Sequence, residues 1–235
     1  MPIASARVAL SRVFFQRCFY LFVVLVALLI LSPLVPESVE GRFSANLVNA
    51  FVVVATVSAV GRTMFSFVVV LLLAVPTLLL QWLGLSIDNP QLLAYSWMFG
   101  AMLYLATIVY LLQYVFRPNV MTPDKLFGAA AGYLMLGVFW AYLYRLIGYC
   151  SPAAFAVAGQ PTSLESFDAL YFSMTVLTST GFGDIAPLTR QARGICMIEQ
   201  INGALFVAIL IARLAGVYPA RERYVDEPVD GLRPK

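Results

Sequence analysis

The chain has no histidine and only three cysteines, and these absences exclude several kinds of chemistry. Histidine is the commonest general base in enzymes, so its absence argues against acid–base catalysis. Cys18, Cys150 and Cys196 are too far apart in the sequence for metal-ligand spacing. No glycine loop with a lysine is present to cradle phosphate, and the basic residues are dispersed rather than clustered. We therefore expect neither an enzyme nor a nucleic-acid-binding protein, and no cofactor.

Charged residues are also scarce, because they make up 11% of the 235 residues while hydrophobic residues make up 61%. A soluble domain carries about 25% charged residues. The sequence therefore predicts an all-α integral membrane protein, and six segments are long enough to cross a bilayer as helices. These segments are residues 14–35, 45–60, 64–85, 92–116, 126–149 and 192–217. The second is short and carries Asn46, Asn49, Thr56 and Ser58.

The run Thr178-Ser179-Thr180-Gly181-Phe182-Gly183-Asp184 lies between the fifth and sixth apolar segments. Gly181 and Gly183 can adopt positive φ angles, which aim successive carbonyl oxygens in the same direction. A column of such oxygens, with the Ser179 hydroxyl at its inner end, replaces the hydration shell of a cation. The alternative interpretation is a tight glycine turn in an ordinary loop.

Residues 163–177, directly before this run, are expected to form a short helix that ends where the run begins. Thr162 and Glu165 fit a capping box at its start. The partial negative charge at its C-terminal end would favour a cation. With an apolar segment on each side, the region around residues 126–217 resembles the pore module of the potassium channel superfamily.

The resemblance implies a potassium-selective filter in a homotetramer, because one chain supplies one filter strand and too few oxygens to surround an ion. The implied filter residues are Thr178, Ser179, Thr180, Gly181, Phe182 and Gly183, with K⁺ bound at Ser179, Thr180, Gly181 and Phe182 and with Asp184 at the outer mouth. The implied permeant ions are monovalent cations, and K⁺ is the only bound metal expected.

The filter departs from the family's usual Thr-Val-Gly-Tyr-Gly in three positions. Ser179 lacks the methyl group of threonine, Thr180 adds a hydroxyl that needs a partner, and Phe182 cannot donate the hydrogen bond of tyrosine. We therefore expect conduction of K⁺ with less strict selectivity. The alternatives are a non-selective cation channel, a channel-like subunit of a potassium uptake complex, and a non-conducting subunit of a larger channel.

The six segments suggest three parts: a four-helix membrane domain over residues 1–120, a pore domain over 121–217 and a short cytoplasmic tail over 218–235. The layout is similar to that of voltage-gated cation channels, with a re-entrant pore helix and filter between the fifth and sixth helices. The fourth segment contains no Lys or Arg, however. Each charge that crosses the membrane contributes about 2.3 kcal/mol per 100 mV, so we expect weak voltage dependence.

The sixth segment contains an acid and a glycine that are expected to act near the filter. Glu199 should support it as a brace that accepts hydrogen bonds from Thr175 or Thr178, and the alternative is that it acts as an ion ligand. Gly203 is either a hinge or a site of close packing against the pore helix. The residues expected to line the cavity are Ala204, Val207, Ile211 and Ala215, and the alternative is that they pack on a neighbouring subunit.

The basic residues indicate an orientation in the membrane. With both termini in the cytoplasm, eleven Lys and Arg lie inside and only Arg42, Arg145, Arg190 and Arg193 lie outside. We expect a multi-pass protein of the plasma (cell inner) membrane, in contact with membrane lipid. Arg145 is expected to pair with Glu165 or Asp168, or to extend to the interface.

Overall fold

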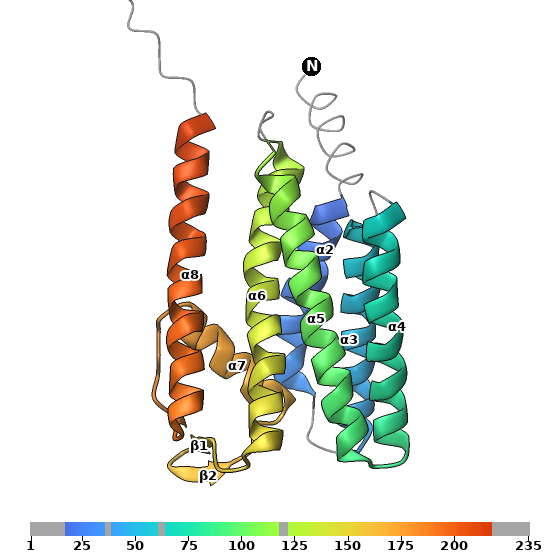
Figure 1. Ribbon diagram of the computed structural model, residues 1–235, viewed down its shortest axis with the longest axis vertical. Helices are drawn as coiled ribbons and strands as arrows, with labels where there is room; N and C mark the ends of the chain where they lie inside the picture. Colours follow the sequence, from blue (N-terminus) through green and yellow to red (C-terminus); the bar gives the residue numbers. More distant parts are fainter. Residues whose placement is uncertain (1–16, 36–38, 61–63, 118–121, 218–235) are drawn as a thin grey trace, which may run out of the picture.

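The computed structural model describes residues 17–35, 39–60, 64–117 and 122–217, apart from the side chains at 39, 40, 42, 60 and 214–217. Long helices run side by side, and a short helix, α7, lies near one end between α6 and α8 (Figure 1). The helices are α2 (Arg17–Leu31), α3 (Val39–Val60), α4 (Met64–Ser86), α5 (Pro90–Val115), α6 (Pro123–Cys150), α7 (Ser166–Leu177) and α8 (Arg190–Val217), with a 3-10 turn, η1 (Ser32–Leu34), after α2.

The starts of α5 and α6 follow from capping. The Asn89 side chain accepts a hydrogen bond from the backbone N of Gln91 (2.9 Å), and Pro90 occupies the first turn. Thr122 caps α6 in the same way, with Pro123 following it. Proline suits the first turn of a helix because it has no N–H to leave unpaired there. Both helices therefore begin two or three residues before the apolar segments predicted from the sequence.

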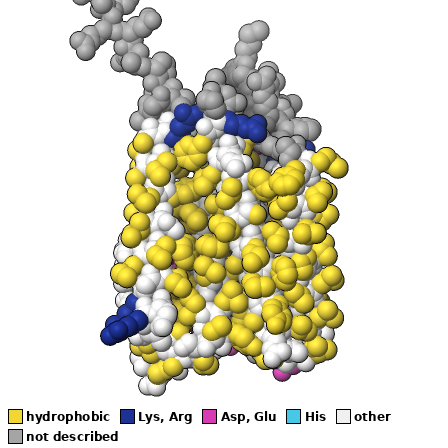
Figure 2. Space-filling view, in the orientation of Figure 1, with side chains coloured by type: hydrophobic (Ala, Val, Ile, Leu, Met, Phe, Trp, Pro, Cys, Tyr) yellow, Lys and Arg dark blue, Asp and Glu magenta, His cyan; other side chains and the backbone are white. Residues whose placement is uncertain are grey.

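Five helices are long and apolar enough to cross a membrane: Arg17–Leu34, Met64–Ser86, Pro90–Val115, Pro123–Cys150 and Arg190–Arg213. Within the described residues, α3 contributes a shorter apolar stretch, Phe43–Ala59, and the side chains at 42 and 60 on either side of it are not described. Figure 2 shows hydrophobic side chains over most of the height of the visible face, as expected for a surface in contact with lipid. The chain is thus an all-α, multi-pass membrane protein with five candidate spans and a pore region, and the sixth span stays a prediction.

A small sheet at one end of the bundle was not predicted. Its strands are β1 (Phe155–Val157), β2 (Gln160–Thr162) and β3 (Ile185–Pro187), paired antiparallel in the order β2-β1-β3. Strand β3 follows the filter, and the backbone N of Ala158 donates to the carbonyl O of Asp184 (2.8 Å). The sheet therefore connects the loop after α6 to the outer end of the filter.

The sheet also corrects the predicted start of the pore helix. Thr162 ends β2, where its hydroxyl donates to the Ser163 carbonyl, and α7 begins only at Ser166. Glu165 occupies the N-cap position but makes no side-chain capping hydrogen bond. The predicted capping box is wrong because β-pairing takes up the residue that was expected to cap the helix.

The helices differ sharply in how much of their surface the chain itself covers. Half of the apolar window of α6 is buried, whereas only 11% of that of α8 is buried. Figure 1 shows α8 (red) standing at the edge of the bundle, beside α7 and α6. The core is centred on α6, which packs against α2, α5 and α7. Helix α8 thus leaves most of its surface free for contacts beyond its own chain.

Candidate functional site: the pore helix and filter loop

The filter loop continues directly from the C-terminal end of α7. The backbone N of Ser179 donates to the Val176 carbonyl (2.9 Å), and that of Thr180 donates to the Thr175 carbonyl (2.9 Å). These bonds satisfy carbonyls that the last turn of a helix leaves without a partner. Residues 178–184 are all exposed in the single chain, so the described part of the chain leaves most of the loop uncovered.

Positive φ angles occur at every second residue of the loop: Ser179 (+57°), Gly181 (+54°) and Gly183 (+86°). The prediction that both glycines adopt this conformation is confirmed. Ser179 was not expected to do so, because a residue with a Cβ loses roughly 1–2 kcal/mol in the left-handed region. Alternation of left- and right-handed residues is the backbone geometry that turns successive peptide groups toward one side of the chain.

The hydroxyl groups at the start of the loop bond to one another and to the pore helix. Thr178 Oγ1 lies 2.8 Å from Thr180 Oγ1 and 2.7 Å from the carbonyl O of Met174. The hydroxyl that Thr180 has in place of the family's valine therefore has a partner. This bonding also fixes the rotamer of Thr178 at the inner end of the loop.

The outer half of the loop contacts Tyr171 of the pore helix. The rings of Phe182 and Tyr171 are stacked, with centroids 6.3 Å apart and planes 7° from parallel. A hydrogen bond between Tyr171 and Asp184 is the largest cause that raises the pKa of the Tyr171 phenol. Tyr171 thus contacts both Phe182 and Asp184. Sequence reasoning noted Tyr171 only as a substitute for the family's tryptophan and missed these contacts.

Glu199 connects α8 to the pore helix and to α6 within the buried core. It accepts a hydrogen bond from the Tyr144 hydroxyl and lies 2.6 Å from Ser173 Oγ, and its side chain is fully buried. The expected partners were wrong, because Thr175 donates to the Phe172 carbonyl and Thr178 to the Met174 carbonyl. Both threonines bond within α7, and Ser173 lies on the face of α7 that meets α8.

The bonding around Ser173 indicates the protonation state of Glu199. Ser173 Oγ lies 2.7 Å from the carbonyl O of Gly137 and 2.6 Å from Oε1 of Glu199. A serine hydroxyl has one hydrogen, so it cannot donate to both oxygens. If Ser173 donates to the Gly137 carbonyl, which has no hydrogen, the proton between Ser173 and Glu199 must come from the carboxyl group. The arrangement is therefore complete when Glu199 is neutral.

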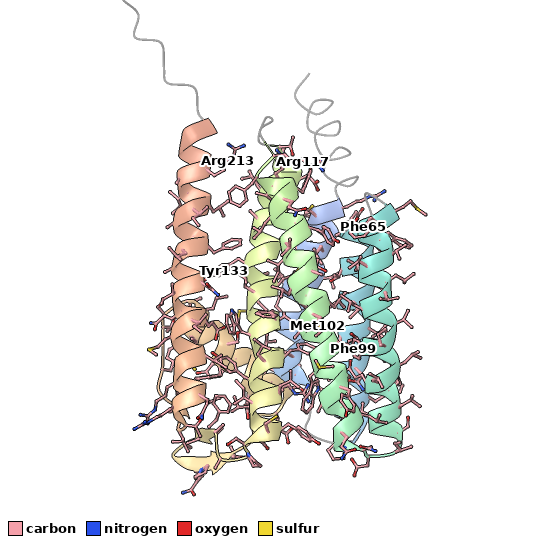
Figure 3. The ribbon with its side chains drawn as sticks, viewed as in Figure 1. Phe65, Phe99, Met102, Arg117, Tyr133 and Arg213 are labelled. Atoms are coloured by element: carbon pink, nitrogen blue, oxygen red, sulfur yellow. The ribbon has the colours of Figure 1, made fainter. Side chains whose placement is uncertain are left out.

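Gly203 lies where α8 meets the last turn of the pore helix. A Cβ at this position would collide with the carbonyl O of Leu177, so only glycine permits this close approach. The same carbonyl accepts a hydrogen bond from the Tyr133 hydroxyl (3.3 Å), whose side chain lies between α6 and α8 (Figure 3). The contact favours the packing interpretation of Gly203 and leaves its role as a hinge a prediction.

The expected cavity-lining residues of α8 lie on its uncovered surface. Ala204, Val207 and Ile211 are all exposed in the single chain, and the side chain of Ala215 lies outside the described residues. Exposure of this kind fits either a water-filled cavity or a neighbouring subunit, so both alternatives remain.

Two arginines make contacts that the sequence did not indicate. Arg213, near the end of α8 away from the sheet, donates from Nη2 to the carbonyl O of Arg117 (3.0 Å), beyond the end of α5 (Figure 3). The Arg145 guanidinium lies over the Trp97 ring, 4.1 Å from its centroid, which is a cation–π contact. The first contact links α8 to the segment that joins α5 to α6.

Residues 130–218 match the family described as ion channel. This region is an ion channel pore module. It contains most of α6, the sheet, α7, the filter loop and α8, and the match assigns it to channels rather than to an enzyme family. Searches of curated proteins and of solved structures found no significant match. Helices α2 to α5 lie before the matched residues.

Proposed function

We propose that this protein is a potassium-selective channel in which four copies of the pore module surround one conduction path. The alternating φ angles at Ser179, Gly181 and Gly183 carry the proposal. That backbone lets each chain present a column of carbonyl oxygens, and such oxygens replace the water around K⁺. The proposed ligands are the oxygens of Ser179, Thr180, Gly181 and Phe182, with the side chain of Asp184 at the outer mouth.

The uncovered surface of α8 supports assembly into a homotetramer. Met197, Ile201, Leu205 and Ile209 are each more than half exposed, although they are large and apolar. Lipid can cover part of this surface, but a filter strand exposed along its whole length needs protein partners. Most soluble and membrane homo-oligomers are closed by symmetry, and four strands around one axis enclose an ion.

We also propose that α3 is a sixth span and that both termini are cytoplasmic. The polar side chains of α3 bond inside the bundle, where the Asn49 amide donates to Gln81 (2.7 Å) and its oxygen accepts from Tyr142 (3.0 Å). Polar residues that bond between helices are compatible with a membrane span. The pore domain then extends over residues 121–217, and the tail over 218–235 lies inside the cell.

Ion flux into liposomes tests the proposed function. The purified full-length protein should admit K⁺ and exclude most Na⁺, and reversal potentials under bi-ionic conditions should follow the K⁺ gradient. Equal permeability to both ions would favour a non-selective cation channel. Silence of the protein alone, with current only beside a partner, would favour a subunit of a larger channel or uptake complex.

A further inference from the structure

The outer end of the filter loop is bonded to the β1–β2 hairpin, which belongs neither to the filter nor to the pore helix. The backbone N of Ala158, in the turn of the hairpin, donates to the carbonyl O of Asp184 (2.8 Å). Strand β1 then pairs with β3, and the backbone N of Leu188 donates to the Ala154 carbonyl (2.8 Å) at the other end of the pairing. Residues 184–188 are therefore attached to the hairpin at both ends.

The two halves of the filter loop are supported by different elements. The backbone N–H groups of residues 179–181 all donate to carbonyls of α7. Those of Phe182 and Gly183 make no hydrogen bond within the described part of the chain. The Phe182 ring stacks on Tyr171, but phenylalanine has no hydroxyl to bond. The bond from Ala158 therefore supports the outer end of the loop, where α7 supplies no backbone bond.

Strand β1 can act as a fixed point because it is anchored in the core. Phe155 is fully buried, and its ring contacts Tyr144 of α6 (centroids 5.5 Å apart) and Phe172 of the pore helix (5.6 Å). The rings of Tyr144 and Phe172 also contact each other, with centroids 5.0 Å apart. Aromatic pairs of this kind stabilise the packing beyond the burial of their surface. The position of the hairpin is thus set by α6 and the pore helix together.

The backbone of the hairpin is strained at the residue that makes this contact. Ala158 has a φ of +48° and Gly159 a φ of +81°, the two positive angles of a tight two-residue turn. Asparagine, aspartate or glycine is preferred at the first of these positions, and a residue such as alanine is disfavoured there. The Ala158 side chain is exposed, so its packing does not account for the conformation. The strand pairing on both sides of the turn and the bond to Asp184 hold it.

We propose that Ala158 is a positioning residue of the filter, whose N–H holds the Asp184 peptide group and thereby fixes the Phe182 carbonyl, the outermost of the proposed ligand oxygens. Its effect on ions rests on the proposed function, whereas its effect on the backbone does not. Without this N–H, residues 182–184 open more often, while residues 179–181 keep their bonds to α7. A ring of oxygens that is held less closely to one size discriminates less between K⁺ and Na⁺.

An amide-to-ester substitution at position 158 of the full-length protein tests the backbone contact. Lactic acid in place of Ala158 retains the methyl group but replaces the N–H by an oxygen that cannot donate. Hydrogen–deuterium exchange, read on overlapping peptides, should rise by about two- to tenfold for residues 182–184 and stay unchanged for residues 179–181, as expected for the loss of one hydrogen bond. Unchanged exchange at residues 182–184 would overturn the proposal, whichever ion the pore conducts.

Two controls separate this bond from other effects of the change. Ala158→Gly keeps the N–H and relieves the strain, so its exchange and its selectivity should match those of the parent. An ester at Gly159, made with glycolic acid, should also behave as the parent, because the Gly159 N–H makes no hydrogen bond among the described residues. Equal effects of the two esters would mean that ester chemistry, rather than the Ala158–Asp184 bond, loosens the loop, and would overturn the proposal.

Bi-ionic reversal potentials measure the consequence for ions. The ester at position 158 should lower the ratio of K⁺ to Na⁺ permeability by about two- to tenfold. An unchanged ratio in a K⁺-selective parent would overturn the positioning role, whereas a parent that does not distinguish the ions would contradict the proposed function and leave exchange to decide the contact. If the ester chain does not assemble, Phe155→Leu, which weakens the ring contacts that anchor the hairpin, should raise exchange at residues 182–184, and unchanged exchange there would overturn the proposal.

Discussion

Ser179 combines two properties at the inner end of the filter, because it holds a positive φ of 57° and also supplies a hydroxyl oxygen. Glycine would adopt the angle without strain but would lose the oxygen. Ser179 is therefore a strained residue, and we propose that its hydroxyl oxygen contacts the ion. Gly181 and Gly183 have the same sign of φ without this cost.

Gly181→Ala should abolish current. The chain leaves open space around this position, so no atom obstructs a methyl group. The backbone conformation itself disfavours alanine here, because a φ of +54° costs an alanine residue about 1–2 kcal/mol in each subunit. Liposome K⁺ flux measures the effect, with chromatography to show that the variant assembles as the parent does. Normal flux in this variant would place the filter elsewhere in the chain.

The Ser179 hydroxyl can be tested by a matched pair of substitutions. Ser179→Thr retains the oxygen and should hold or raise the ratio of K⁺ to Na⁺ permeability. Ser179→Ala keeps the Cβ, and therefore the backbone strain, but removes the oxygen, so it should lower occupancy of the inner site and change conductance. Bi-ionic reversal potentials distinguish the two. Identical selectivity in parent and Ser179→Ala would show that this hydroxyl does not contact the ion.

A neutral Glu199 predicts an asymmetric result for two substitutions. Glu199→Gln places an amide that donates to Ser173 and an oxygen that accepts from Tyr144, so stability and flux should change little. Glu199→Leu removes the acceptor of the buried Tyr144 hydroxyl and the donor to Ser173 Oγ, and the unsatisfied Tyr144 hydroxyl should cost about 1–3 kcal/mol. Thermal unfolding in detergent compares them. Equal loss in both variants would mean that the native carboxyl is charged.

At the scale of elements, α5 lies where the proposed resemblance to voltage-gated channels would put a sensor, and it contains no Lys or Arg between Pro90 and Val115. Without charges that move through the field, the membrane potential supplies almost no energy for gating. Currents in symmetric K⁺ should therefore be nearly linear in voltage. Single-channel recording over a wide voltage range tests this, and steep activation would require gating charges in another element.

The sequence predicted the helices and the turn of the filter because both depend on local patterns. Apolar runs mark the spans, and two glycines mark the positive φ angles at 181 and 183. The three-stranded sheet was missed because each strand has only three residues and pairs with distant ones. The partners of Glu199 were wrong for a related reason, since which face of α7 meets α8 depends on how whole helices pack.

At the scale of the whole molecule, the pore module and the N-terminal helices meet along α6, which packs against α2 and α5. The Arg213–Arg117 hydrogen bond adds a contact at the end away from the sheet. Helices α2 and α5 therefore contact the pore module along α6, and the segment that follows α5 contacts the end of α8. Their arrangement gives them a physical route to the filter even though no voltage-sensing charges were found in α5.

One filter strand per chain, exposed along its whole length, has a consequence for genetics. If four chains complete each pore, a single defective copy interrupts the ring of oxygens for all of its neighbours. Equal co-expression of parent and Gly181→Ala chains should then leave only about one sixteenth of the channels fully normal, from random mixing of four subunits. Residual K⁺ flux near one half would instead mean that each chain conducts by itself. A mutation in one allele would thus be dominant, although the altered chain folds and reaches the membrane.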